Sequence, residues 1–184
     1  PKNAERSFIL ADDFGSVTEL LRTREVRNSQ HRQTGPGRNA LHPMLFGNNG
    51  KCPSRSCLLT GTHSGHTAIR GNVELDPEGQ FPLPADAQTI FHDFQNAGYK
   101  TGAFVNGDWE FIGSTGDPKK QGIDEFYGYN CQLLAHSYYP DHLWDNDKRE
   151  LKDNTLDVQY GKGTYSQDLI HSKALDFLDR MGKK

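Results

Sequence analysis

Short apolar runs that end in turn residues alternate with segments of helical periodicity along the chain. The run at residues 7–11 ends at Asp12 and Asp13, and it predicts a buried strand with acidic groups at its C-terminal end. A second run, at residues 100–105, follows a helical segment and predicts another strand. Strands that alternate with helices indicate an α/β domain, in which ligands collect where the strands end.

Three segments show the pattern of helices. Pro53 and the residues after it predict a helix that begins in segment 51–61, and its first N–H groups would face an anion. A second helix is expected before Gly98 and a third near the C-terminal end, whereas residues 145–162 are polar, lack periodicity and are expected to form a surface excursion. The expected apolar faces are Ile90, Phe91, Phe94 and Ala97 in the second helix, and Leu169, Ile170, Ala174, Leu175, Phe177 and Leu178 in the third.

Composition narrows the class of protein without naming its chemistry. A hydrophobic content of 34% is low, but ten Phe, seven Tyr and two Trp argue against a disordered chain. The net charge of -3 gives no footprint for nucleic acid or an anionic membrane, and no apolar run is long enough to span a membrane. Three cysteines without a CxxC pair are an odd set, which is mildly against a disulfide framework.

Asp12 and Asp13 are the first candidates for chemistry. Two adjacent carboxylates repel each other, so burying both is costly unless a cation neutralises them. Hard oxygen ligands of this kind suit Ca²⁺ or Mg²⁺. The alternative is a helix N-cap with a solvated neighbour.

The segment 51–61, Lys-Cys-Pro-Ser-Arg-Ser-Cys-Leu-Leu-Thr-Gly, resembles the signature of the sulfatases. Phrases at residues 7–15, 60–72, 82–103 and 116–144 also resemble sulfatase sequences, in the same order and at suitable spacing. The resemblance implies an alkaline-phosphatase-like α/β sandwich, with a mixed and mostly parallel sheet flanked by helices. It also implies that residues 1–184 are the N-terminal part of a catalytic domain whose remainder lies outside this chain.

The resemblance implies hydrolysis of sulfate esters. Asp12 and Asp13 would bind the divalent cation, Ca²⁺ or Mg²⁺, and a formylglycine made from the first Cys of the signature would attack sulfur. Arg55 would orient the sulfuryl group, and His66 and His136 would contact the substrate. That substrate would be a sulfated small molecule or glycan, and the compartment would be periplasmic, secreted or lysosomal. Aromatic residues between 116 and 144 would either stack on a sugar or pack against the sheet.

Two positions depart from the family pattern. Lys51 occupies the nucleophile position, and Cys52 is one residue closer to Arg55 than the maturation motif allows, so formylglycine is expected only if position 51 is a modified Cys. Asp108 stands where sulfatases carry the Lys that pairs with sulfate, and its charge would repel an anion.

Three hypotheses therefore stay open, and whether the chain is an enzyme stays open with them. The first is a hydrolase of sulfate esters, and the second is an inactive sulfatase-like protein that binds a sulfated ligand. The third is a phosphoryl-transfer or metal-binding relative with another nucleophile, which would require Ser or Thr in place of Lys51.

Overall fold

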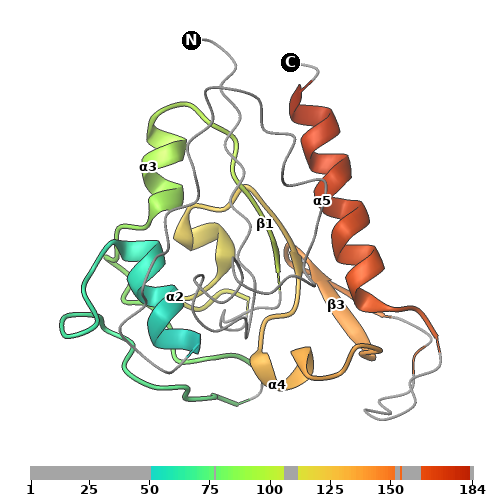
Figure 1. Ribbon diagram of the computed structural model, residues 1–184, viewed down its shortest axis with the longest axis horizontal. Helices are drawn as coiled ribbons and strands as arrows, with labels where there is room; N and C mark the ends of the chain where they lie inside the picture. Colours follow the sequence, from blue (N-terminus) through green and yellow to red (C-terminus); the bar gives the residue numbers. More distant parts are fainter. Residues whose placement is uncertain (1–50, 77, 106–111, 152–153, 155–162, 183–184) are drawn as a thin grey trace, which may run out of the picture. The chain divides into compact units, whose positions relative to one another are not determined.

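A computed structural model describes residues 51–76, 78–105, 112–151, 154 and 163–182, all within one compact unit, Gly47–Lys184. The expected strand at residues 7–11 and the predicted site residues Asp12, Asp13 and Asp108 lie outside the described residues. The elements, in chain order, are α2 (Lys51–Thr60), α3 (Ile90–Asn96), β1 (Gly102–Val105), the 3₁₀ helix η2 (Pro118–Gln121), β2 (Glu125–Gly128), α4 (Gln132–Ala135), β3 (His142–Asp145), β4 (Lys148–Leu151) and α5 (Ser166–Gly182) (Figure 1). Among the described residues, no helix is long and apolar enough to cross a membrane.

The sheet has the strand order β1-β2-β3-β4. β1 and β2 are parallel, with Gly102 opposite Glu125 and Val105 opposite Gly128. β2–β3 and β3–β4 are antiparallel pairs. The predicted mixed α/β class is confirmed, but the expected parallel majority is absent from the described strands, because two of their three pairs are antiparallel.

Helices cover both faces of this sheet, and Figure 1 shows β1 between α3 and α5. Successive residues of a strand point to opposite faces. Tyr127 packs with Ile170 of α5 in one core cluster, with Phe104 against it. Its neighbour Phe126 joins a second cluster, against which Leu59 of α2 and Phe91 of α3 pack. The described part therefore has a helix layer, a sheet and a second helix layer.

The predicted helix before Gly98 is confirmed as α3, which starts with a capping box. The Thr89 hydroxyl accepts the N–H of His92 at 3.4 Å, and the His92 ring accepts the N–H of Thr89 at 3.1 Å. Gly98 follows the C-cap with a φ of 85°, a conformation that favours glycine. Ile90 was expected in the buried face but is 42% exposed, because it begins the helix beside the cap.

The predicted C-terminal helix is confirmed as α5, but its buried face is narrower than expected. Ile170 is buried, and the rings of Phe177 and Phe104 lie 5.4 Å apart. Leu175 and Leu178 are 50% and 40% exposed, so their assignment to the buried face is wrong. α5 contacts only β1 and β2 extensively, and a helix that packs on two strands buries only a stripe of its surface.

The expected polar excursion after residue 145 begins instead as a β-hairpin. Asn146 turns the chain with a φ of 55°, and its backbone N–H donates to the carbonyl of Phe126 at 2.9 Å. Its side-chain oxygen accepts the N–H of Phe126 at 3.0 Å. These two bonds attach the hairpin turn to the start of β2, so the prediction for residues 145–151 is wrong.

Candidate functional site

The predicted helix of segment 51–61 is confirmed as α2, and Cys52 is buried at its start. Cys52 is 2% exposed, and its backbone N–H donates to Oδ1 of Asn72 at 3.1 Å. Its thiol donates to Oε1 of Gln80 at 3.3 Å, and Oε1 of Gln132 lies 3.9 Å from the same sulfur. The sulfur atom is therefore surrounded by protein groups and is not presented to solvent.

Lys51 and Arg55 lie on one side of α2, because residues four apart on a helix are neighbours. Both side chains are half-buried. The first turn of α2 carries no acidic residue that would offset its positive end. Two cationic side chains thus lie at the end of the helix where free N–H groups also concentrate positive charge.

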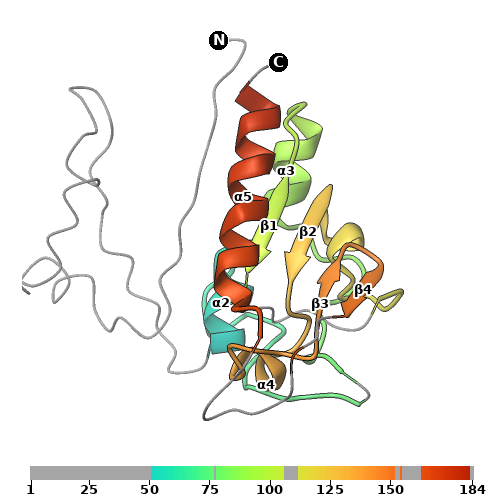
Figure 2. The ribbon, with the colours of Figure 1, turned by 90° about the vertical axis from the view of Figure 1, so that its right-hand side faces the viewer.

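This end of α2 lies where the parallel strands finish. β2 ends at Gly128, and α4 begins at Gln132, whose side chain reaches Cys52. Figures 1 and 2 both show α2 and α4 at the same end of the sheet. The carboxyl ends of parallel strands are the usual place for ligands in α/β folds. We therefore take the start of α2 as the candidate functional site.

Buried amide groups with unused hydrogen-bonding capacity accompany this site. Asn130 follows β2 and is 0% exposed, and neither its side-chain oxygen nor its nitrogen has a hydrogen-bond partner among the described residues. The side-chain nitrogen of Gln80 is in the same situation. Buried polar groups normally find partners in protein or water. These two side chains therefore offer buried donors and an acceptor that could bind water or a ligand.

The two predicted histidines are both at the surface. His66 is exposed in the loop after α2, where its backbone N–H donates to the carbonyl of His63 at 2.8 Å. His136 is exposed and caps the C-terminal end of α4 through its backbone. Because α4 starts beside Cys52, His136 lies at the same end of the sheet as the start of α2.

Three tyrosines form a surface cluster, and two of them follow His136 closely in the chain. The ring of Tyr165 lies 5.9 Å from that of Tyr138 and 5.7 Å from that of Tyr139, measured between centroids. Tyr138 is 54% exposed and Tyr165 is 37% exposed. In contrast, Tyr127 and Tyr129 are buried in the core. The packing interpretation therefore holds for Tyr127 and Tyr129, and stacking on a sugar stays a prediction for the exposed tyrosines.

The buried side chain of Tyr129 holds the chain segment next to the tyrosine cluster. Its hydroxyl donates to the carbonyl of Ser137 at 2.8 Å, and burial raises the pKa of Tyr129 to about 12. Tyr129→Phe should cost about 1 kcal/mol of unfolding free energy, because the Ser137 carbonyl would lose a buried partner. Urea unfolding measures this loss, and Tyr165→Phe, at an exposed ring, is the matched control. Equal unfolding midpoints for the two variants would contradict the anchoring role.

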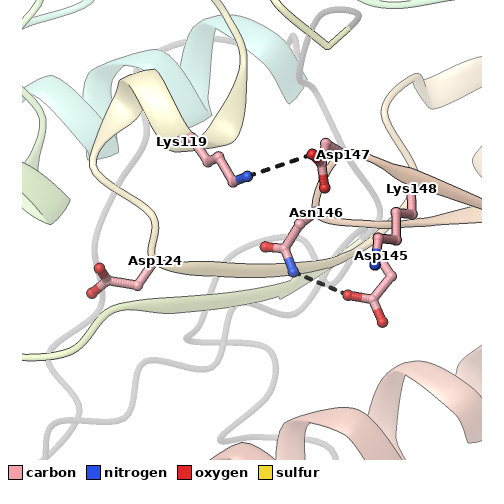
Figure 3. Close-up of a pocket in the computed structure, with 6 residues that line it drawn as sticks. All are labelled: Lys119, Asp124, Asp145, Asn146, Asp147 and Lys148. Atoms are coloured by element: carbon pink, nitrogen blue, oxygen red, sulfur yellow. Dashed lines mark hydrogen bonds and ion pairs between the residues drawn. The ribbon is translucent and has the colours of Figure 1, made fainter.

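A shallow hollow of about 300 Å³ lies at the other end of the strands, near the hairpin turn (Figure 3). Its lining consists of Lys119, Asp124, Asp145, Asn146, Asp147 and Lys148. Each carboxylate has a cationic partner: Asp147 pairs with Lys119, Asp145 with Lys173 and Asp124 with Lys100, at 3.9, 2.8 and 3.3 Å. Neutralised carboxylates leave little net charge for a cation. Within the described ranges, no group of three His, Cys, Asp or Glu side chains could hold a metal ion.

Comparison with protein families decides the wider identity of the chain. A family model described as Sulfatase matches residues 8–184. The chain belongs to the sulfatase family. A search of curated proteins found no match. The family is one of sulfate ester hydrolases, whose members generally use a metal ion and formylglycine.

The chain has no cysteine at the position where the resemblance to sulfatases places formylglycine. Position 51 is a lysine, and the neighbouring thiol of Cys52 points into the protein toward Gln80. The residues present therefore do not fit a formylglycine. The predicted metal ligands Asp12 and Asp13 lie outside the described residues.

Several contacts around the site were not predicted. Gln80 and Gln132 contact Cys52 from 28 and 80 residues away. Gln132 lies within the sulfatase-like phrase at residues 116–144, whereas Gln80 lies outside all of these phrases. Asn72 lies within the sulfatase-like phrase at residues 60–72, and that phrase was the available signal for its contact with Cys52.

Proposed function

We propose that this chain recognises a sulfate ester at the start of α2 and, with Lys51 at the nucleophile position, does not hydrolyse it through formylglycine. The observation that carries the proposal is that the first turn of α2 combines half-buried cationic side chains with a buried sulfur atom. Lys51 and Arg55 are half-buried cations at the helix start, whereas the sulfur of Cys52 is buried against Gln80. The site thus retains groups that attract an anion and lacks an accessible nucleophilic sulfur.

Local charge supports binding of an anion here. The chain as a whole has a net charge of -3, so a sulfate group must be attracted by nearby groups. The Arg55 guanidinium can donate two parallel hydrogen bonds to sulfate oxygens, and the Lys51 ammonium adds a point charge. The positive end of α2 contributes further.

We further propose that the chain binds a divalent cation. We assign it to Asp12 and Asp13, with Ca²⁺ as the expected ion and Mg²⁺ as the alternative, because hard cations prefer carboxylate oxygens. When bound, the ion would supply Lewis-acid polarisation of a sulfate oxygen. Asp108 would act in the opposite direction, because its negative charge repels sulfate.

The proposed substrate class is a sulfated carbohydrate, with a sulfated small molecule as the alternative. Tyr138, Tyr139 and Tyr165 present aromatic surface next to His136, and aromatic rings with polar tips suit the mixed apolar and hydroxylated faces of a sugar. His66 is proposed as a second contact from the loop after α2.

The proposed fold is the alkaline-phosphatase-like sandwich, with residues 1–184 as the N-terminal part of the catalytic domain. The layered arrangement of α5, the sheet, and α2 with α3 supports it. The second candidate function is hydrolysis of a sulfate ester without formylglycine. The family match over residues 8–184 favours it, and turnover of an aryl sulfate would distinguish it.

Arg55→Ala tests the proposed binding role. We expect the affinity for 4-methylumbelliferyl sulfate to fall about 10-fold or more, since hydrogen bonds to a charged group are worth roughly 1.5–3 kcal/mol. Isothermal titration in Ca²⁺ measures the change. Arg180→Ala is the control, because Arg180 lies on α5 and pairs with Glu125 at 2.6 Å. Unchanged affinity in Arg55→Ala would refute the assignment.

A further inference from the structure

The loop after α2 connects the candidate site to the β-hairpin. Its base contacts the start of α2 twice, since Asn72 accepts the Cys52 N–H and Gln80 accepts the Cys52 thiol. The loop is closed by a bridge between Glu74 and Gln80, and the N–H of Phe81 donates to the carbonyl of Val73 at 2.8 Å. Residues 73–76 and 78–81 thus form one hydrogen-bonded unit, which we call the bridging loop.

The tip of the bridging loop binds the hairpin through a carboxylate. One carboxylate oxygen of Glu78 accepts a hydrogen bond from Nε2 of His142 at 2.9 Å. Its other oxygen accepts the indole N–H of Trp144 at 2.9 Å. The His142 side chain is 5% exposed and that of Glu78 is 19% exposed. Two contacts within the protein therefore hold the loop tip on β3.

His142 also faces two charged groups of the hairpin. Its Nδ1 lies 2.7 Å from Oδ1 of Asp141 and 2.8 Å from Nη2 of Arg149. Arg149 also pairs with the other oxygen of Asp141 at 3.6 Å. A protonated imidazole donates from both nitrogens, to Glu78 and to Asp141 at once, whereas in the neutral ring Nδ1 can instead accept from Arg149. The two neighbouring carboxylates favour the protonated form.

We propose that His142 is a pH-dependent clamp that fixes the bridging loop on the hairpin and thereby positions the start of α2. Loss of the proton removes the ring charge that pairs with Glu78 and leaves Arg149, among the described residues, as the remaining cation near that carboxylate. The loop tip then loosens from β3, and the contacts of Asn72 and Gln80 with Cys52 loosen with it. His142 is a positioning residue in this scheme, since its described contacts are with the loop and the hairpin. The inference goes beyond the proposed function and does not depend on it.

The direction of the pH dependence follows from the two partners. Burial alone would lower the pKa of His142, but hydrogen bonds to Glu78 and Asp141 outweigh it and raise the pKa above the ordinary value of 6.5. Burial would raise the pKa of Glu78, but hydrogen bonds from His142 and Trp144 outweigh it and lower the pKa below 4.5. The stabilising contribution of His142 is thus complete below pH 6.5 and is lost as the pH rises through its folded-state pKa. The contribution of Glu78 is complete above pH 4.5 and is lost as the pH falls through its folded-state pKa.

Hydrogen exchange of the whole chain between pH 5 and 9 tests the clamp without any sulfate ester in the sample. After correction for intrinsic exchange, we expect amides of the bridging loop and of residues 51 and 52 to exchange faster above the folded-state pKa of His142. The rise should be about 10-fold for each pH unit by which that pKa exceeds its unfolded value. Glu78→Gln should make the exchange fast and independent of pH. His171→Gln, at an exposed histidine of α5, should leave the wild-type profile unchanged.

The wild-type protein provides a second measurement that needs no variant to fold. The NMR signals of the His142 ring and of the Trp144 indole N–H should titrate together, with a midpoint above pH 6.5. A His142 midpoint at or below 6.5 would overturn the clamp. So would a loop whose exchange has the same pH profile in Glu78→Gln as in the wild type.

Discussion

Gly128→Ala should unfold the β1–β2 pair and with it most of the described fold. Gly128 ends β2 opposite Val105, with a φ of 153°. A Cβ added there would clash with the carbonyl oxygen of Val105, which also accepts the N–H of Tyr129 at 3.2 Å. Backbone atoms cannot yield as a flexible side chain can. We therefore expect a loss of more than about 4 kcal/mol, which is a large part of a typical domain's stability.

Urea unfolding followed by circular dichroism measures this effect. Gly71→Ala is the matched control, because a Cβ at Gly71 meets nothing within 4 Å. Its unfolding free energy should stay within about 0.5 kcal/mol of the wild type. If Gly128→Ala unfolded at the same urea concentration as Gly71→Ala, the parallel pairing of β1 with β2 would have to be abandoned.

Lys51→Cys should supply the cysteine that the chain lacks at the nucleophile position. The change restores the Cys-x-Pro-Ser-Arg frame of the sulfatase signature at the start of α2. Coexpressed with a formylglycine-generating enzyme, combined with Asp108→Lys and carried in the whole catalytic domain, the variant should hydrolyse aryl sulfates. Loss of an enzyme nucleophile typically costs several orders of magnitude in rate, so the gain should be on the order of 10³-fold or more.

Two comparisons separate this gain from a change of charge. Lys51→Ala with Asp108→Lys removes the same ammonium without supplying a thiol, and it should stay inactive. A peptide map of residues 51–55 reports whether the new cysteine is converted to the aldehyde. A converted but inactive variant would mean that position 51 is not the nucleophile position in this fold.

The helices and β1 were predictable because their signals are local. α2 begins at a proline-containing segment, α3 has a polar cap and a glycine after its end, and α5 has a long apolar stripe. The hairpin was not predictable in the same way. β4 reads Lys-Arg-Glu-Leu and lies at the edge of the described sheet, and charged residues on an edge strand resemble those of a surface loop.

The candidate site was predictable only in part, for a related reason. Segment 51–61 identified the helix and its cations from adjacent residues. Glu78 and His142 are 64 residues apart, and the Trp144 contact spans 66. Such pairs depend on how the bridging loop folds back over the sheet, and no periodicity or capping pattern encodes that path. His66 and His136 stood out as isolated histidines, but the structure places both at the surface.

Saturation-transfer NMR of 4-methylumbelliferyl sulfate with the unmodified chain in Ca²⁺ tests the central proposal most directly, because one sample reports both binding and product. We expect transfer to the intact ester, weakened by Arg55→Ala, and no release of 4-methylumbelliferone. Release of that product, abolished by Asp13→Ala, would contradict it. Absence of any transfer to the ester would contradict it equally.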